Sequence, residues 1–214
     1  YLFVNPINYN SLPSYQVDGI TIPANTTSYE SLFLKFDTAG NLIAGKNFYA
    51  NSTVYNSSFI TDAVFDGINF IVSGIFECDS TDTYYLGMDG IQFPKEYQDY
   101  TYSGLFAKIT IDGGINWQKV IHCKSARKFY TNLQLDQNND IYEALYFQGK
   151  VNYNNVEYTF NDTVGEKAIM KFDNSGNLKY LKTIDNYGDT YSGKNWQDYI
   201  VQLDLFGVDK YNLS

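Results

Sequence analysis

The chain has very few of the residues that most often build active and metal sites. Its 214 residues include one histidine, His122, one arginine, Arg127, and two cysteines, Cys78 and Cys123. One arginine cannot form the guanidinium cluster with which sialidase-like sites hold a substrate carboxylate. Two cysteines exclude a metal site of repeated Cys-x-x-Cys motifs but allow one disulfide. A Cys78–Cys123 disulfide and two free thiols therefore stay open as alternatives.

Positive charge and long apolar runs are scarce as well. The chain has 15 Lys and Arg against 24 Asp and Glu, a net charge of −9. Binding to nucleic acid or to an anionic membrane needs a basic patch, so both kinds of partner are disfavoured. The longest uncharged apolar run, residues 67–76, is about half the length of a membrane-spanning helix. We read it as a buried strand and expect no membrane insertion.

Aromatic residues are abundant. They make up 18% of the chain, with 21 Tyr and 15 Phe, and such side chains favour the half-buried surface of strands. No window sustains the i, i+3, i+4, i+7 spacing of an amphipathic helix, whereas short alternating segments recur between turns rich in Gly and Asn. The sequence therefore predicts an all-β protein.

Three parts of the chain align with one another. The strings "SLFLKFDTAGNLIAGKNF", "GLFAKITIDGGINWQKVI" and "KAIMKFDNSGNLKYLKTI" share a central lysine, at Lys35, Lys108 and Lys171. A second element shares an aspartate, at Asp66, Asp136 and Asp204, and a third reads "DGITIP", "DGIQFP" and "NNVEYTF". All three markers recur about every 68 residues, and each copy contains four short alternating segments. This pattern is typical of the four-stranded antiparallel blades of a β-propeller.

The order F-x-x-K-F-D-x-x-G-N-L, then a strand ending in Asp, then I-x-V-S-G-x-F and D-G-I-x-[IF]-P resembles the SBBP repeats. These are β-propeller repeats of large secreted bacterial proteins and some giant-virus proteins. We therefore expect residues 1–214 to form about three blades: a partial blade at 1–48, blades at 58–122 and 128–184, and a partial blade at 196–214. Because three blades do not close a propeller, we expect further blades of the same protein or a second copy.

The hairpin turns have predictable chemistry. In "DTAGN" and "DNSGN" an aspartate accepts backbone amides and a glycine supplies the positive φ, at Asp37 with Gly40 and at Asp173 with Gly176. The stretch "TIDGGINW" resembles the Asp-box, a turn of sialidases and other propellers that lies away from their catalytic centres. There we expect Asp112 and Gly114 to play the same two roles and Trp117 to cover the turn.

Catalytic and metal sites have little support. His122 and Cys123 are neighbours on a strand, so their side chains point to opposite faces and do not form a dyad. Asp136, Asn138 and Asp140 have the alternate spacing of a calcium loop but lack its downstream glutamate. The alternative is a plain Asn-rich turn. We expect no catalytic residue and no cofactor other than this calcium candidate.

The long connections offer a binding surface. Strands alternate in direction, so the long, variable connections lie on one face of a propeller and the short turns on the other, and variable loops commonly carry binding residues. The stretch 82–102 is the densest in aromatics, with Tyr84, Tyr85, Tyr97, Tyr100 and Tyr102. These tyrosines either contact a protein or a sugar or pack the insertion onto its own blade.

We therefore expect a non-enzymatic propeller scaffold for protein contact, adhesion or assembly. The alternative is a glycan-binding or glycan-active propeller with its site on the long-loop face. Five Asn-x-Ser/Thr sequons favour an extracellular, cell-surface or virion-associated location, at Asn25, Asn51, Asn56, Asn161 and Asn212.

Overall fold

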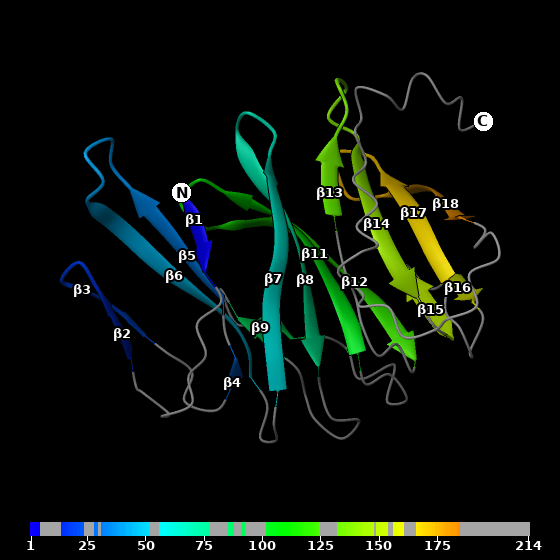
Figure 1. Ribbon diagram of the computed structural model, residues 1–214, viewed down its shortest axis with the longest axis horizontal. Coiled ribbons are helices and arrows are strands. Elements are labelled where there is room, and N and C mark those ends of the chain that lie inside the picture. Colours follow the sequence, from blue (N-terminus) through cyan, green and yellow to red (C-terminus); the bar gives the residue numbers. More distant parts are fainter. Residues whose placement is uncertain are drawn as a thin grey trace, which may run out of the picture.

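The prediction of an all-β protein is confirmed by the computed structural model. It describes residues 1–4, 14–23, 28–29, 31–51, 56–77, 85–87, 91–92, 102–124, 132–147, 149–153, 156–160 and 166–184. These residues form strands and turns that associate into several small, mainly antiparallel sheets (Figure 1). Within these ranges no helix has the length and apolarity to cross a membrane.

Two of the sheets contain the predicted four-strand order. In the second sheet the neighbours are β7 (Asn56–Phe65), β8 (Asn69–Glu77), β11 (Tyr102–Thr110) and β12 (Ile115–Lys124). In the third sheet they are β13 (Asn132–Leu135), β14 (Ile141–Phe147), β17 (Glu166–Phe172) and β18 (Leu178–Ile184). The first sheet has β1 (Leu2–Val4), β5 (Ser31–Phe36) and β6 (Leu42–Asn51).

Three short hairpins accompany the main sheets, and two of them add strands to a sheet while β2–β3 stays a sheet of its own. The hairpins are β2 (Ser14–Val17) with β3 (Ile20–Pro23), β9 (Tyr85–Gly87) with β10 (Ile91–Gln92), and β15 (Lys150–Tyr153) with β16 (Val156–Thr159). The second of them pairs with β6 and the third with β12, and β4 (Ser28–Tyr29) joins β7 in parallel. The described strands therefore make sheets of five, seven, four and two strands, which corrects the expectation of uniform four-stranded units.

The hairpins join their sheets in the same register. Tyr49 of β6 lies opposite Gly87, and His122 of β12 lies opposite Asn152. The third repeated element reads "DGIQFP" and "NNVEYTF", and its equivalent positions are Gly90 and Asn155. Gly87 stands three residues before Gly90, and Asn152 stands three residues before Asn155. In both cases a hairpin inserted after one sheet's second strand is added to the outer strand of the preceding sheet.

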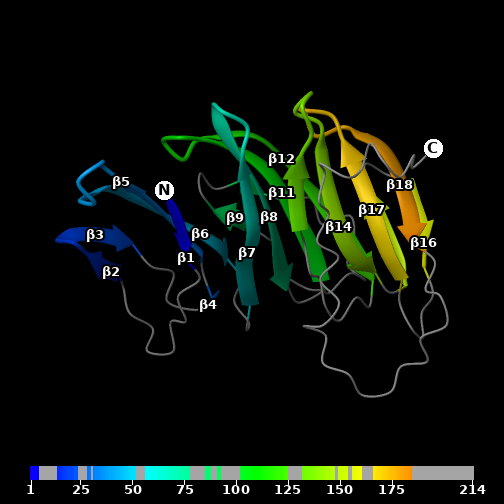
Figure 2. The same ribbon diagram turned by 45° about the horizontal axis from the view of Figure 1, so that its top comes forward.

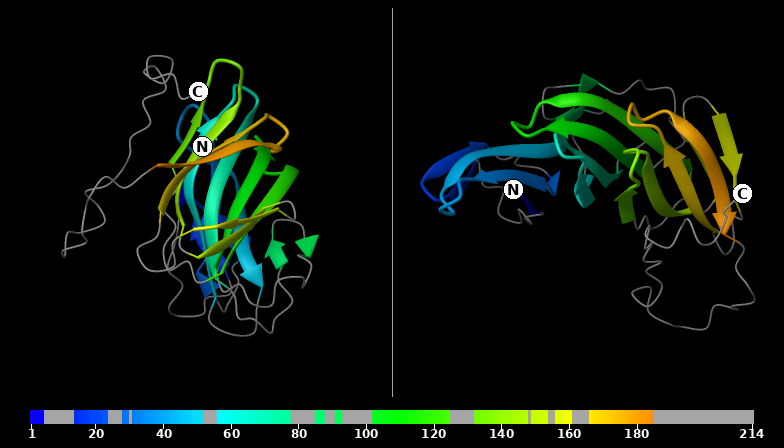
Figure 3. Two further views of the ribbon diagram at one scale, coloured as in Figure 1. Left: turned by 90° about the vertical axis from the view of Figure 1, so that its right-hand side faces the viewer. Right: turned by 90° about the horizontal axis from the view of Figure 1, so that it is seen from above.

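The three main sheets follow one another along an arc (Figure 3, right). The turns β5–β6, β7–β8 and β13–β14 lie at one end of the molecule (Figures 1 and 2). The described strands do not close into a ring or barrel.

The core lies between consecutive sheets. Alternate residues of each strand face the preceding sheet and the following one, so both faces are apolar. The cluster between the first two sheets includes Phe33, Ile60, Val72, Leu105 and Ile109. The cluster between the second and third includes Ile71, Phe106, Leu145, Met170 and Phe172. Each such side chain, when fully buried, contributes roughly 1.5–3 kcal/mol to folding.

Candidate functional site

The three repeated lysines lie at the same register position in three sheets. Lys35 lies opposite Ala44, Lys108 opposite Trp117, and Lys171 opposite Tyr180. In each hairpin the register shifts directly after the lysine. A bulge at one fixed place turns the strand in the same way each time, so the three lysines start from equivalent backbone positions.

In the second and third sheets the lysine binds the aspartate that ends the first strand. Lys108 Nζ lies 2.7 Å from Asp66 Oδ2, and Lys171 Nζ lies 3.2 Å from Asp136 Oδ2. These are the same aspartates that mark the repeat in the sequence. The lysine thus ties the first strand of a sheet to its third.

The lysine also reaches the next sheet along the stack. Lys35 Nζ donates to Asp112 Oδ1 at 2.7 Å, and Lys108 Nζ donates to Asn174 Oδ1. Asp112 lies in the β11–β12 turn and Asn174 in the β17–β18 turn. Both junctions between main sheets are therefore spanned by a lysine side chain.

The buried pair has a clear electrostatic consequence. Burial by itself would raise the pKa of Asp66, but the Lys108 ammonium and the backbone amides of Asn69 and Ile68 lower that pKa below its ordinary value. Asp66 therefore stays ionised at neutral pH beside Lys108. Both side chains are largely buried, 4% and 11% exposed, so removing either one leaves an uncompensated charge.

The calcium candidate lies in a lysine cluster. Asp140 Oδ2 is 3.0 Å from Lys171 Nζ, and Asp140 Oδ1 is 2.6 Å from Lys179 Nζ. Asp136 Oδ1 accepts the backbone amides of Asn138 and Asp140 at 2.8 and 3.0 Å. A calcium ion would have to displace two ammonium groups, so these contacts favour the Asn-rich turn. In the described ranges no three His, Cys, Asp or Glu side chains are grouped to hold a metal ion.

The β5–β6 turn has the predicted chemistry. Asp37 Oδ1 accepts the backbone amides of Ala39 and Asn41 at 2.9 and 2.8 Å, and Gly40 has φ +88°. The Asn41 side chain and these amides lower the pKa of Asp37. The β17–β18 turn repeats the arrangement with its own aspartate and glycine, Asp173 and Gly176.

The Asp-box-like turn differs from its prediction. The acceptor for the Gly114 amide is Thr110 Oγ1, at 2.9 Å, and the positive φ of +78° belongs to Gly113. The register explains the change, because Thr110 stands two residues after Lys108, as Asp37 stands two residues after its lysine. The Asp112 carboxylate is thereby left to bind the preceding sheet.

Trp117 covers a neighbouring turn rather than its own. Its Nε1 donates to the Asn174 carbonyl at 3.1 Å. Its ring lies so close to Gly176 that an added Cβ there would sit 2.9 Å from a ring carbon. The indole lies on the face of β12 that looks toward the third sheet, and the stacking of sheets therefore decides which turn it covers.

A buried carboxyl group lies between the second and third sheets. Glu143 is 1% exposed, Ser73 Oγ donates to its Oε1, and its Oε2 has no hydrogen-bond partner among the described groups. Burial raises the pKa of Glu143 to about 8; the Asp62 carboxylate adds to this and Ser73 opposes it. Glu143 is therefore mostly protonated at neutral pH. Glu143 was not predicted from the sequence, although alternation places it on the same strand face as the buried Ile141.

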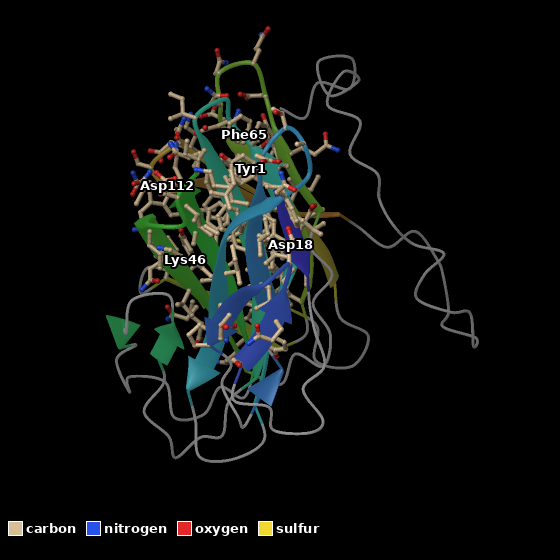
Figure 4. All side chains as sticks on the ribbon, turned by 90° about the vertical axis from the view of Figure 1, so that its left-hand side faces the viewer. Tyr1, Asp18, Lys46, Phe65 and Asp112 are labelled. Atoms are coloured by element: carbon tan, nitrogen blue, oxygen red, sulfur yellow. The ribbon has the colours of Figure 1, made fainter. Side chains whose placement is uncertain are left out.

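An aromatic cluster reaches the surface at the turn end. We call Tyr1, Phe3, Phe33, Phe65 and Phe70 the aromatic edge. The ring centroids of Tyr1 and Phe70 are 5.0 Å apart, and those of Phe65 and Phe70 are 4.9 Å apart. Tyr1 and Phe65 are each 50% exposed. Figure 4, seen from the side of the first sheet, shows both residues in the upper part of the molecule, as it does Asp112.

The aromatic edge was not foreseen because its members come from two sheets and carry no shared motif. Charged groups flank it: Lys35 Nζ lies 5.9 Å from the centre of the Tyr1 ring. The same Lys35 Nζ donates to Asp112 Oδ1 at 2.7 Å, which adds a carboxylate to this flank. Half-exposed rings beside a lysine and a carboxylate can contact a protein side chain or the apolar face of a sugar.

Several predicted positions are not tested. Tyr84, Tyr97, Tyr100, Cys78 and Arg127 lie outside the described residues. Tyr85, Tyr102, His122 and Cys123 lie in β9, β11 and β12, where the structure describes their backbone alone. The tyrosine surface and the disulfide stay predictions.

The comparisons with known proteins add no family. No protein-family model matches the chain, and a search of curated proteins finds no match. The resemblance to SBBP repeats therefore rests on the sequence motifs alone.

Proposed function

We propose that this chain is part of a β-propeller that acts as a non-catalytic scaffold for contact with other proteins. One observation carries the proposal: three consecutive sheets present the same lysine at the same register, next to the same bulge. A series of equivalent sheets placed along an arc (Figure 3) is how a propeller is built.

The charged side chains support a structural role. Each of the three repeated lysines forms an ion pair. The partner of Lys35 lies in the next sheet, and Lys108 donates a further hydrogen bond to the next sheet. Groups held in this way stiffen the stack. A rigid scaffold with an exposed aromatic edge suits protein contact, since interface hot spots are rich in aromatic residues. We place this scaffold on a cell or virion surface, in line with the sequons.

Three measurements test this proposal. Electron microscopy of the purified protein should show a ring of radially arranged sheets, and an open, extended particle would contradict the propeller. Antibodies against the chain should label intact source cells or particles without permeabilisation. Incubation with a panel of glycoside substrates should give no turnover, and any turnover would contradict the non-catalytic role.

A second candidate function is glycan binding at the aromatic edge. The half-exposed rings of Tyr1 and Phe65 beside the ion pair of Lys35 and Asp112 favour it, because sugars stack on aromatic rings and hydrogen-bond to charged groups. A glycan array separates the two functions. Binding that is lost in Phe65→Ala and kept in Ile68→Ala, a neighbouring exposed apolar residue, would select glycan binding. An array on which the protein binds no glycan would contradict glycan binding.

A further inference from the structure

Two neighbouring turns of the second sheet carry exposed isoleucines. Ile68 lies in the β7–β8 turn and is 73% exposed, and Ile111 lies in the β11–β12 turn and is 38% exposed. The ladder between β8 and β11 ends at the pair of Asn69 and Thr110. Ile68 precedes Asn69 and Ile111 follows Thr110, so each isoleucine is one residue beyond a paired position. Because paired residues of adjacent strands have Cβ atoms about 5 Å apart, the two isoleucines leave the sheet as neighbours.

The β7–β8 turn is held by hydrogen bonds that do not involve an apolar side chain. The Asp66 amide donates to the Asn69 carbonyl at 2.9 Å, and Gly67 has φ +96°, as in a two-residue hairpin turn with glycine in first place. Asp66 Oδ1 accepts the backbone amides of Ile68 and Asn69 at 2.9 and 2.6 Å. The Ile68 side chain is mostly exposed, so burial within the turn does not account for its apolar character.

The equivalent positions of the other sheets are polar. Ile111 stands three residues after the repeated lysine of its sheet, where the first and third sheets have Thr38 and Asn174. Ile68 stands three residues before the residue opposite that lysine, where the third sheet has Asn139. Polar residues therefore serve these turns as well. Adjacent exposed apolar side chains that the fold does not require are typical of a surface that a partner covers.

The most exposed charge beside the isoleucines is negative. Asp112 directly follows Ile111, and its side chain is 78% exposed, whereas that of its partner Lys35 is 22% exposed. The hydrogen bond from Lys35 lowers the pKa of Asp112, so this carboxylate is ionised at neutral pH. The half-buried Lys46 donates to the Gly113 carbonyl of the same turn. The two ammonium groups are thus held by the turn, the carboxylate faces solvent, and the chain as a whole carries a charge of −9, which attracts a basic partner.

We propose that Ile68, Ile111 and Asp112 form a contact surface, the isoleucine patch, for a protein segment whose apolar side chains are flanked by lysine or arginine. The isoleucines bury the apolar side chains of that segment, and Asp112 at the border pairs with one of its cations. The inference rests on the role in protein contact proposed above, and it names the surface and the chemistry of the partner. An anionic membrane does not fit this patch, because the net charge of −9 repels it.

The test is fluorescence polarisation of two labelled peptides with the full 214-residue chain. In one peptide leucines alternate with lysines, and in the other serines replace the leucines, so the two differ in apolar side chains but not in charge. The leucine peptide should bind about tenfold more tightly or better, because burial of one isoleucine side chain is worth that factor. Asp112→Asn should weaken the binding of both peptides and reduce its dependence on salt.

The variant that locates the surface is Ile68→Asn combined with Ile111→Asn. It gives both turns the residue type of the third sheet, so thermal unfolding should be unchanged, and the advantage of the leucine peptide should disappear. If this variant does not fold, Ile68→Thr combined with Ile111→Thr takes its place, since the first sheet has Thr38 at one of the equivalent positions. Val156→Asn is the matched control, because Val156 is 50% exposed on β16 at the outer edge of the sheet and should leave the advantage intact.

Three outcomes would overturn the inference. Equal binding of the two peptides would show that the protein makes no apolar contact with them. An advantage of the leucine peptide that persists in the double isoleucine variant would place the contact surface elsewhere and leave the proposed scaffold standing. Binding to neutral phosphatidylcholine vesicles that is lost in the same variant would make the patch a membrane contact. Failure of the propeller is seen separately, as the absence of a ring in electron microscopy.

Discussion

Replacing the buried Glu143 by glutamine should stabilise the protein at neutral pH. Among the described residues Glu143 has no basic partner to offset its burial, and its pKa in the folded protein is about 8 against 4.5 for an ordinary glutamate. Folding therefore requires the side chain to take up a proton at any pH between these two values. Glutamine is always neutral, has nearly the same shape, and keeps an oxygen for the Ser73 hydroxyl.

The size of the effect follows from proton linkage. The folded state binds the proton and the unfolded state does not, so stability falls by about 1.4 kcal/mol per pH unit as pH rises from 4.5 to 8. This contribution is fully present below pH 4.5 and is lost as pH rises through the folded pKa. At pH 7 the loss amounts to about 3 kcal/mol, as an upper bound, and Glu143→Gln should regain most of it.

The assay is urea unfolding of the protein and the Glu143→Gln variant at pH 5, 7 and 9. The stability difference between them should grow from pH 5 to pH 7 and level off near pH 9. Glu157→Gln is the matched control, because Glu157 forms an exposed pair with Lys150 and should show no such growth. A difference that is constant across this range, or a glutamine variant less stable at pH 9, would refute the reasoning, since Glu143 would then be charged and compensated in the folded state.

Three further predictions concern single side chains. Gly176→Ala should destabilise the protein by about 2 kcal/mol more than Gly40→Ala in thermal unfolding: both residues have positive φ, but the added Cβ meets an indole ring only at Gly176. Equal losses would mean that backbone strain alone sets the cost. Gly45→Ala should loosen the β2–β3 hairpin, because the added Cβ would clash with the Ile22 side chain of that hairpin. Faster proteolysis within residues 14–23 would show it, and an unchanged cleavage rate would contradict the packing. Asp66→Asn should cost about 3 kcal/mol in urea unfolding, and adding Lys108→Met should recover part of this loss; additive losses would argue against the pair.

The same buried pair predicts an acid limit. The pKa of Asp66 lies below its ordinary 3.8, so its contribution to stability is present above pH 3.8 and is lost as pH falls through the lower, folded pKa. In Asp66→Asn the acid-induced loss of stability below pH 4 should be smaller, as measured by circular dichroism during acid titration. An identical acid transition in both proteins would show that Asp66 is unpaired in solution.

The sequence by itself determined the strands, their order and much of their turn chemistry. Alternation and turn residues act within a few neighbours along the chain, so the antiparallel order β7–β8–β11–β12 and the Asp37 turn could be predicted. The repeated spacing also marked Lys108 and Asp66 as equivalent to other positions before their 2.7 Å contact was seen. These features depend on local hydrogen bonds and on side chains of one sheet.

Only the tertiary structure decided what happens between sheets. Which turn Trp117 covers, where the inserted hairpins pair, and that Glu143 meets Ser73 all depend on how one sheet sits against the next. Asp112 illustrates the difference, because its motif predicted a role in its own turn, whereas its carboxylate binds Lys35 in the preceding sheet. A short motif specifies a turn through its own backbone, but contacts across a sheet junction are set by the packing of residues far apart in the chain.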